Sequence, residues 1–231
     1  MAKVTAGPLA GVVSGKLGSV VFSRGRYGAY MRMRVMPTGV SSDSTRAIHN
    51  RLSLVSKAWA LRGVADRLAW GTWAATHPIV DRLGNAQVLH GAAAYMQLNM
   101  RVLQALGTMI NVPPVASSPA PLLGLSAAID VGAGAVNLLS WTSGATGVNE
   151  CVQVWAAVVD SPGRAYYTNF KKLIMISGDQ QATDLDMEAA ITARFGSVMV
   201  GQNVFIEAIV VSNLTGLISA KAACETTVIS T

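Results

Sequence analysis

The chain contains few residues whose types and spacing could support catalysis. Its three histidines, His49, His77 and His90, could exchange protons near neutral pH. They follow neither His-Glu-x-x-His nor any other metal-binding spacing. His77 precedes a proline and His90 precedes a glycine, so both are interpreted as solvated residues at helix ends. No histidine is therefore predicted to be catalytic.

Two glycine-rich stretches are similar to nucleotide-binding loops but lack essential residues. A P-loop needs Ser or Thr after its Gly-Lys pair to bind magnesium, whereas Leu17 follows Gly15 and Lys16 here. The segment 132–134 begins like a dinucleotide-binding loop, but residue 137 is Asn and a predicted hairpin replaces the required strand-to-helix connection. Neither stretch predicts nucleotide binding.

The remaining patterns also fail to form an active site. Asp184, Asp186 and Glu188 match a calcium loop for three residues but lack its glycine and bidentate glutamate, so they predict the start of a helix. No Gly-x-Ser-x-Gly motif is present. We therefore predict that the protein is not an enzyme and has no cofactor, metal or small-molecule substrate.

Arginines are concentrated in a strand-like segment near the N-terminus. Residues 20–22 lead through glycines at 25 and 28 into residues 29–35, which predicts a β-hairpin. Beyond the turn, aromatic and basic residues alternate with Met31, Met33 and Val35, so one face is basic and the other apolar. Arg24 and Arg26 could join the basic face. The candidate interaction residues are Arg24, Arg26, Tyr30, Arg32 and Arg34.

Charge is distributed unevenly along the chain. Residues 1–110 carry a net charge of +10, whereas residues 111–231 carry −4. The two halves are complementary, which favours contact between them within one chain or between chains. A basic half could equally bind nucleic acid, so charge alone leaves both interpretations open.

The composition indicates a surface that is covered by other molecules. Apolar residues form 51% of the chain and charged residues only 13%, against about 25% charged in an average globular domain. A free monomer usually needs more surface charge to stay soluble. The shortage predicts contacts with neighbouring subunits, while a monomer with a surface of small polar residues remains the alternative.

Cysteine usage and hydropathy suggest neither a disulfide framework nor a membrane segment. Cys151 and Cys224 each lie in an apolar run and are predicted to be reduced core residues. The apolar stretch Val204–Val211 contains Glu207 and is too short to cross a bilayer. The N-terminus has no continuous apolar stretch typical of a secretory signal.

The pattern along the chain predicts an α+β protein with four parts. Residues 1–40 form an extended arm or β-hairpin, residues 41–107 a small helical domain, residues 108–121 a Pro-rich linker, and residues 122–231 an antiparallel β-sandwich domain. Within the helical domain, Gly63 is expected to separate two helices, the second ending near Thr76, and a third is expected over Ala92–Leu106 with Gly107 as its C′ residue. The tryptophans at 59, 70 and 73 are predicted to be core residues.

The C-terminal part shows short apolar runs separated by turn residues, which predicts six or seven strands. These strands are expected at 127–131, 136–141, 151–159, 166–170, 173–176, 203–212 and 217–224. Residues 183–195 are expected to form a helical interruption, because acidic residues lie early in it and Arg194 lies late.

The segment Ser14–Pro37, which reads SGKLGSVVFSRGRYGAYMRMRVMP, resembles the N-terminal signature of a family of uncharacterised phage and prophage proteins. In that family a helical segment with paired tryptophans follows, matched here by Ser56–Trp59 and Arg67–Trp70. The motif His90-Gly-x-x-x-Tyr95-x-x-x-Asn99 also fits. The resemblance covers about residues 10–107, although Thr38–Thr45 departs from the usual Asn-Pro-x-Thr turn. It implies a role in the virion or in its assembly.

The C-terminal part resembles a fibronectin type III or immunoglobulin-like domain. Leu139-Ser-Trp141-Thr is similar to the early-strand tryptophan motif of that fold, and Val204–Val211 with Asn213 and Gly216 is similar to its last hairpin. Such domains commonly decorate phage structural proteins as contact modules. This resemblance concerns the fold, which does not determine function.

Two functions from different classes follow. The first is a structural subunit of a tailed-bacteriophage virion, as a capsid decoration, head–tail connector or tail component, made in the host cytoplasm and bound to copies of itself and other virion proteins. The second is a nucleic-acid-binding protein that uses the basic N-terminal half. We expect no membrane partner.

Overall fold

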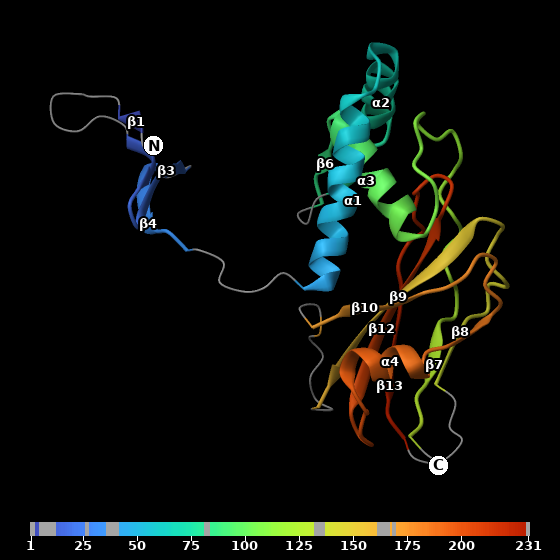
Figure 1. Cartoon of the computed structure of the whole chain (residues 1–231). Helices are drawn as coiled ribbons and strands as arrows, with labels where there is room; N and C mark the ends of the chain where they lie inside the picture. Colours follow the sequence, from blue (N-terminus) through green and yellow to red (C-terminus); the bar gives the residue numbers. More distant parts are fainter. Residues whose placement is uncertain are drawn as a thin grey trace. The chain divides into compact units, whose positions relative to one another are not determined.

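The chain is a mixed α+β protein in which helices α1, α2 and α3 lie between two groups of antiparallel strands in the sequence, and α4 lies within the second group (Figure 1). The computed structural model describes residues 3–4, 13–25, 28–35, 42–80, 84–131, 137–160, 167 and 170–229. It divides into two compact units, Met1–Arg46 and Ala47–Thr231. The finer division at residues 41, 108 and 122 stays a prediction.

The first unit contains an antiparallel sheet in the order β1-β2-β3-β4. The strands are β1 (Lys3–Val4), β2 (Val13–Leu17), β3 (Val20–Gly25) and β4 (Gly28–Met33). The predicted hairpin of β3 and β4 is confirmed, and part of the glycine-rich lead adds β2 to it. Gly18 has φ +56° in the short β2–β3 turn, a conformation that glycine adopts without strain.

Three helices follow: α1 (Asp43–Ala60), α2 (Val64–Thr76) and α3 (Gly91–Gln104). The Ser42 hydroxyl accepts a hydrogen bond from the Thr45 backbone N–H at 3.2 Å and caps α1. Gly63 separates α1 from α2, which ends at Thr76, so both predicted limits are confirmed. A short hairpin of β5 (Ile79–Val80) and β6 (Ala86–Gln87) leads to α3.

Helices α2 and α3 approach each other at a pair of glycines. A Cβ atom on Gly91 would lie 2.8 Å from the backbone nitrogen of Gly71, so only glycine fits at position 91 without a shift. Beside this contact, the Tyr95 ring lies 5.1 Å from Trp59 and 5.2 Å from Trp70, measured between centroids. The tryptophans at 59, 70 and 73 all belong to this helical core, as predicted.

The C-terminal end of α3 differs from the prediction. Leu106 follows the C-cap residue Ala105 and has φ +60°, so it occupies the left-handed position that was predicted for Gly107. Gly107 is needed for a different reason, because a Cβ atom there would overlap the backbone carbonyl of Asn213. The turn after β12 therefore packs directly on the end of α3.

The proline-rich segment 108–121 has no regular secondary structure, and tryptophan and asparagine side chains hold it against the helices. The indole N–H of Trp70 donates to the Asn111 carbonyl at 2.9 Å, and that of Trp73 donates to the Pro114 carbonyl at 3.0 Å. The buried Asn99 amide both donates to and accepts from the Ile110 backbone. The segment is thus fixed to the helical core.

The C-terminal strands form two antiparallel sheets that share one hydrophobic core. One sheet has the order β11-β8-β7 and the other β10-β9-β12-β13. Side chains of both sheets pack together, including Leu139 and Leu185 from the first and Val154 and Ile206 from the second. The strands are β7 (Ser126–Ala128), β8 (Leu138–Ser140), β9 (Glu150–Val159), β10 (Lys172–Ile176), β11 (Asp184–Asp186), β12 (Asn203–Ser212) and β13 (Ala222–Thr227).

Residues 183–195 are not one helix, so this prediction is wrong in its first part. Asp184 and Asp186 flank Leu185 in β11, which pairs with β8, and α4 (Glu188–Phe195) begins only afterwards. Pairing of Leu185 with Leu139 buries an apolar side chain, which outweighs the helix preference of the acidic residues. The Asp186 carboxylate still accepts a hydrogen bond from the Glu188 N–H at 2.9 Å.

The strand predicted at 166–170 lies mostly outside the described residues; Tyr167 and Phe170 are described, and neither belongs to a strand. The strand predicted at 217–224 is interrupted, because an isolated bridge joins Ile218 to Val211 and the regular strand spans Ala222–Thr227. Ser219 lies in the interruption. Its hydroxyl accepts from the Val210 N–H at 3.0 Å in place of a backbone carbonyl.

The glycine contact between α2 and α3 makes a testable prediction. Gly91→Ala is expected to lower the free energy of unfolding by about 1–3 kcal/mol, because the added methyl group meets backbone. Gly71→Ala, whose Cβ would meet open space, is expected to raise it by about 0.5–1 kcal/mol through helix propensity. Urea denaturation of both variants checks this, and equal effects would contradict the proposed packing.

Candidate functional site

The candidate interaction site is the sheet of the first unit, whose register separates a basic face from an apolar face. Opposed residues in antiparallel strands share a face. Lys16 lies opposite Val21, which lies opposite Arg32, while Ser23 lies opposite Tyr30. Lys16, Arg32 and Tyr30 therefore lie on one face. Both Arg32 and Tyr30 are exposed, as sequence alternation predicts.

The register places the other candidate arginines differently. Position 24 pairs with Ala29 and belongs to the same face as Met31, which is the apolar face. The expectation that Arg24 could join the basic face is therefore wrong. Its side chain and the whole of Arg26 lie outside the described residues. Arg34 lies just past β4, is exposed, and its backbone N–H donates to the Ser19 carbonyl at 2.7 Å.

The opposite face of the sheet is apolar and exposed. Leu17 lies opposite Val20, which lies opposite Met33, and Phe22 lies opposite Met31. These side chains share one face of the sheet and form a continuous apolar surface. The exposed fractions are 67% for Leu17, 69% for Met31 and 77% for Met33. Burying such side chains stabilises by about 1.5–3 kcal/mol each. Covering this face would therefore contribute favourable free energy to association.

Strand β4 lies at the edge of this sheet, because the strand order ends with it. An edge strand presents unpaired N–H and C=O groups on its outer side and can pair with another strand. The first unit thus offers an apolar face and a pairing edge on the same strand, β4, which carries Tyr30, Met31, Arg32 and Met33.

The three histidines occupy the positions of structural or surface residues. The His90 ring accepts a hydrogen bond from the Ala92 N–H and caps α3, and His77 is the C-cap residue of α2. The His77 ring also stacks on Trp73 with centroids 4.3 Å apart. His49 is exposed on α1. The interpretation of His77 and His90 as helix-end residues is confirmed.

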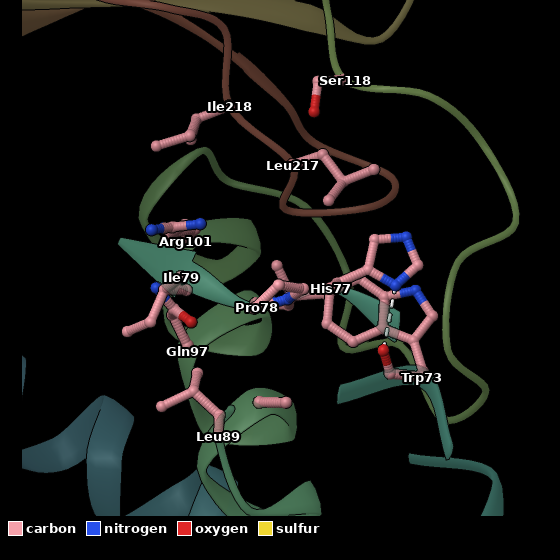
Figure 2. Close-up of a pocket in the computed structure, with 12 residues that line it drawn as sticks. Trp73, His77, Pro78, Ile79, Leu89, Gln97, Arg101, Ser118, Leu217 and Ile218 are labelled. Carbon is pink, nitrogen blue, oxygen red and sulfur yellow. Dashed lines mark hydrogen bonds between the residues drawn. The ribbon is translucent and has the colours of Figure 1, made fainter. Parts of the chain in front are cut away.

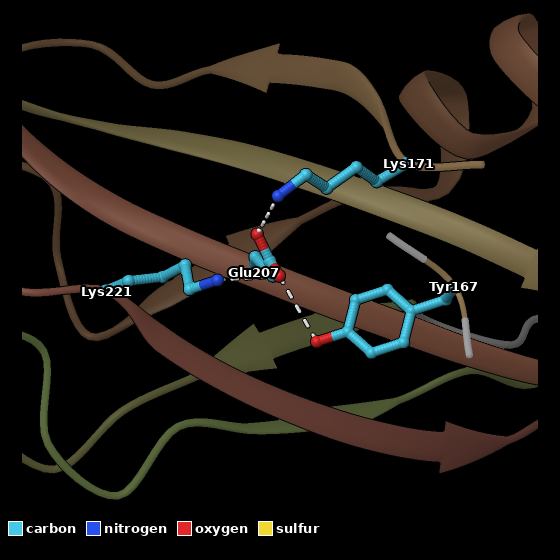
Figure 3. Close-up of polar contacts among 4 residues, drawn as sticks. All are labelled: Tyr167, Lys171, Glu207 and Lys221. Carbon is cyan, nitrogen blue, oxygen red and sulfur yellow. Dashed lines mark hydrogen bonds and ion pairs between the residues drawn. The ribbon is translucent and has the colours of Figure 1, made fainter. Parts of the chain in front are cut away.

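Glu207 on β12 is a buried carboxylate with a complete set of partners, shown in Figure 3. Its oxygens lie 2.8 Å from Lys171 Nζ and 3.0 Å from Lys221 Nζ, and the Tyr167 hydroxyl donates at 3.2 Å. Burial by itself raises the pKa of Glu207, but the hydrogen bonds and charges of the two lysines outweigh it, so the pKa is lowered. Glu207 is therefore ionised and held in place.

Sequence reasoning missed this cluster, since its members come from separate segments. Glu207 was noted only as a charge within an apolar strand. A lone glutamate in such a strand is itself a signal, because a buried carboxylate needs cationic or hydrogen-bonding partners. The sequence does not indicate which of the lysines supply them.

The two cysteines are not reactive groups. Both are free, Cys151 is buried and Cys224 is half-buried, which confirms their interpretation as reduced core residues. Burial raises the pKa of each thiol to about 11, so neither forms a thiolate near neutral pH.

The described part of the chain holds no group of three or more His, Cys, Asp or Glu side chains arranged to bind a metal ion. None of its helices combines the length and the apolar character needed to cross a bilayer.

Comparison with known proteins identifies no family. No family model matches the chain, and no curated protein matches it. Among solved structures, pectate lyase PelI from Erwinia chrysanthemi in complex with tetragalacturonic acid matches with 17% sequence identity and a TM-score of 0.27. The match covers 46% of this chain and 28% of the pectate lyase chain. So low a TM-score carries no inference about fold or activity.

The Glu207 cluster predicts a pH dependence of stability. Because the folded pKa lies below the ordinary value of 4.5, the contribution of Glu207 is fully present above that value and is lost as the pH falls through the folded pKa. Glu207→Gln is expected to lower the free energy of unfolding at pH 7 by about 1–2 kcal/mol. This loss is smaller than for a fully buried ion pair, because both lysines reach solvent.

Urea denaturation at pH 7 and at pH 3 measures this effect. The difference between wild type and Glu207→Gln should narrow at pH 3. Asp179→Asn, which removes an exposed carboxylate, is expected to change stability by less than about 0.5 kcal/mol. A difference for Glu207→Gln that is independent of pH would show that its ionisation does not contribute.

Proposed function

We propose that the protein is a structural, non-catalytic subunit that assembles with copies of itself through the sheet of its first unit. The observation that carries the proposal is the exposed apolar face formed by Leu17, Met31 and Met33. Exposed apolar side chains that adjoin one another mark interaction surfaces, whereas isolated ones are ordinary. A neighbouring subunit would bury this face and remove it from water.

The edge strand and the composition support the same proposal. Strand β4 can extend its sheet by pairing with a strand of another subunit, so backbone hydrogen bonds and apolar burial would act together. The second unit also exposes apolar side chains around the α1–α2 turn, namely Leu61, Val64 and Leu68. A chain with only 13% charged residues has little charge with which to oppose association.

We further propose that the assembly is a tailed-bacteriophage virion, where the subunit would be a capsid decoration, head–tail connector or tail component. The support is the resemblance of Ser14–Pro37 and of the helical motifs to phage and prophage proteins. The motif His90–Asn99 has a packing role in this chain. His90 caps α3, Gly91 allows the close approach of α2, and Asn99 accepts a hydrogen bond from the Ile110 N–H. Residues shared with that family thus maintain the helical unit.

The C-terminal sheets are proposed to form a fibronectin type III-like or immunoglobulin-like sandwich. Two features support this: the three- and four-stranded orders β11-β8-β7 and β10-β9-β12-β13, and a shared core that contains Trp141. In a virion subunit, such a domain would act as a contact module.

A second candidate function is nucleic-acid binding. The observation that favours it is that Lys16 and Arg32 lie on one face of the sheet, on either side of Val21, with Tyr30 on the same face. Basic groups at this spacing could contact phosphates, and an aromatic ring could stack on a base.

Sedimentation velocity of the full chain tests assembly. We expect oligomers whose population rises with protein concentration. Met31→Lys/Met33→Lys is expected to raise the dissociation constant of these oligomers at least tenfold, because charge on the apolar face opposes its burial. Arg32→Gln/Arg34→Gln is the matched control, because it alters the other face of the hairpin at one residue of β4 and at the residue just past it. A wild type that remains monomeric at high concentration with an ordered sheet would overturn the proposal.

A filter-binding titration with single- and double-stranded nucleic acid separates the second candidate. The structural proposal expects weak binding that Arg32→Gln/Arg34→Gln does not change. Binding that falls steeply with salt and is lost in this variant would instead support the second candidate.

A further inference from the structure

The second unit contains a pocket between the α2–α3 region and the turn that follows β12 (Figure 2). Its volume is about 320 Å³, at the lower end of the range for small-molecule sites. Apolar walls come from Trp73, Pro78, Leu89 and Leu217, which belong to separate segments of the chain. This pocket is independent of the sheet on which the proposed function rests.

Arg101 lines this pocket from the last turn of α3. Its guanidinium group has no hydrogen-bond or ion-pair partner among the described residues, and no Asp or Glu is among the residues that line the pocket. Burial lowers the pKa of Arg101, with no neighbouring charge to offset it. The pocket therefore holds a partly buried cation that has no counter-ion among the described residues.

Glu207, which is more deeply buried than Arg101, has the opposite arrangement. Glu207 is compensated by Lys171 and Lys221. For Arg101 the C-terminal end of α3 offers a favourable dipole, but such a partial charge interacts more weakly with a guanidinium group than a paired carboxylate does. The dipole does not replace a counter-ion, so an external anion is needed for full compensation.

The pocket wall opposite Arg101 is rigid and flat. The His77 ring stacks on Trp73 at an interplanar angle of 9°, and His77 Nδ1 lies 2.9 Å from the Trp73 carbonyl oxygen. Figure 2 shows Arg101 on one side of the pocket and this stacked pair on the other, with Pro78 between them. A ligand that reaches both sides must combine an anionic group with an apolar body.

We propose that this pocket binds a small carboxylate attached to an apolar group, with the carboxylate on Arg101 and the apolar group against Pro78 and Leu217. A guanidinium group binds a carboxylate through two parallel hydrogen bonds, which gives both energy and orientation. Gln97 and Ser118, which also line the pocket, add polar groups beside the apolar walls. The same chemistry is offered by a free apolar acid and by the C-terminal residue of a peptide.

Isothermal titration calorimetry on the full chain at constant ionic strength tests the proposal with two probes. Benzoate represents a free acid, and acetyl-leucine represents a peptide C-terminus. We expect saturable binding of at least one probe with a Kd on the order of 1 mM. The neutral analogues benzamide and acetyl-leucine amide should bind at least tenfold more weakly, and the probe that binds more tightly identifies the source.

Two variants assign the site. Arg101→Gln is expected to weaken binding at least tenfold, while Arg194→Gln, which alters an exposed arginine in the last turn of α4, should leave it unchanged. Ser118→Trp changes an exposed lining residue and should block the pocket even if Arg101→Gln fails to fold. Unchanged binding by Ser118→Trp or by folded Arg101→Gln, equal binding of the neutral analogues, or no saturable binding of either probe would overturn the proposal.

Discussion

Trp70 joins the parts of the second unit on which the rest of the structure depends. It is fully buried, its ring makes edge contacts with Trp73 and Tyr95, and its indole N–H donates to the Asn111 carbonyl. A buried indole must place its N–H on an acceptor, so this one residue couples helix packing to the path of the proline-rich segment. That path then leads the chain from the helices to the C-terminal sheets.

Buried charges and apolar surfaces have partners within the chain at some places and lack them at others. In the sheet core, Glu207 has two lysines and a tyrosine, which is how a buried charge is normally accommodated. Among the residues that the structure describes, Arg101 has no such partner, and the side chains of Leu17 and Met33 are exposed. Departures of this kind from complete compensation are expected where a protein binds something, because a ligand or subunit supplies what the chain lacks.

Local signals predicted the elements that local chemistry decides. Gly63 and the proline after His77 limit α2 as expected, and alternation of residue types assigned Tyr30 and Arg32 to one face of the hairpin. The prediction was wrong where long-range pairing competed with local preference. Asp184 and Asp186 have the acidic character of a helix start, but burial of Leu185 beside Leu139 places them in a strand.

The sequence by itself determined the break between α1 and α2, the end of α2, the two-faced hairpin, the reduced cysteines and the absence of recognisable catalytic motifs, because each depends on residues close together in the chain. Tertiary structure alone decided that Gly91 meets Gly71, that Lys171 and Lys221 neutralise Glu207, and that Arg101 lines a pocket with no acidic partner among the described residues. These features depend on which distant segments pack together, and packing selects among contacts that no local pattern distinguishes.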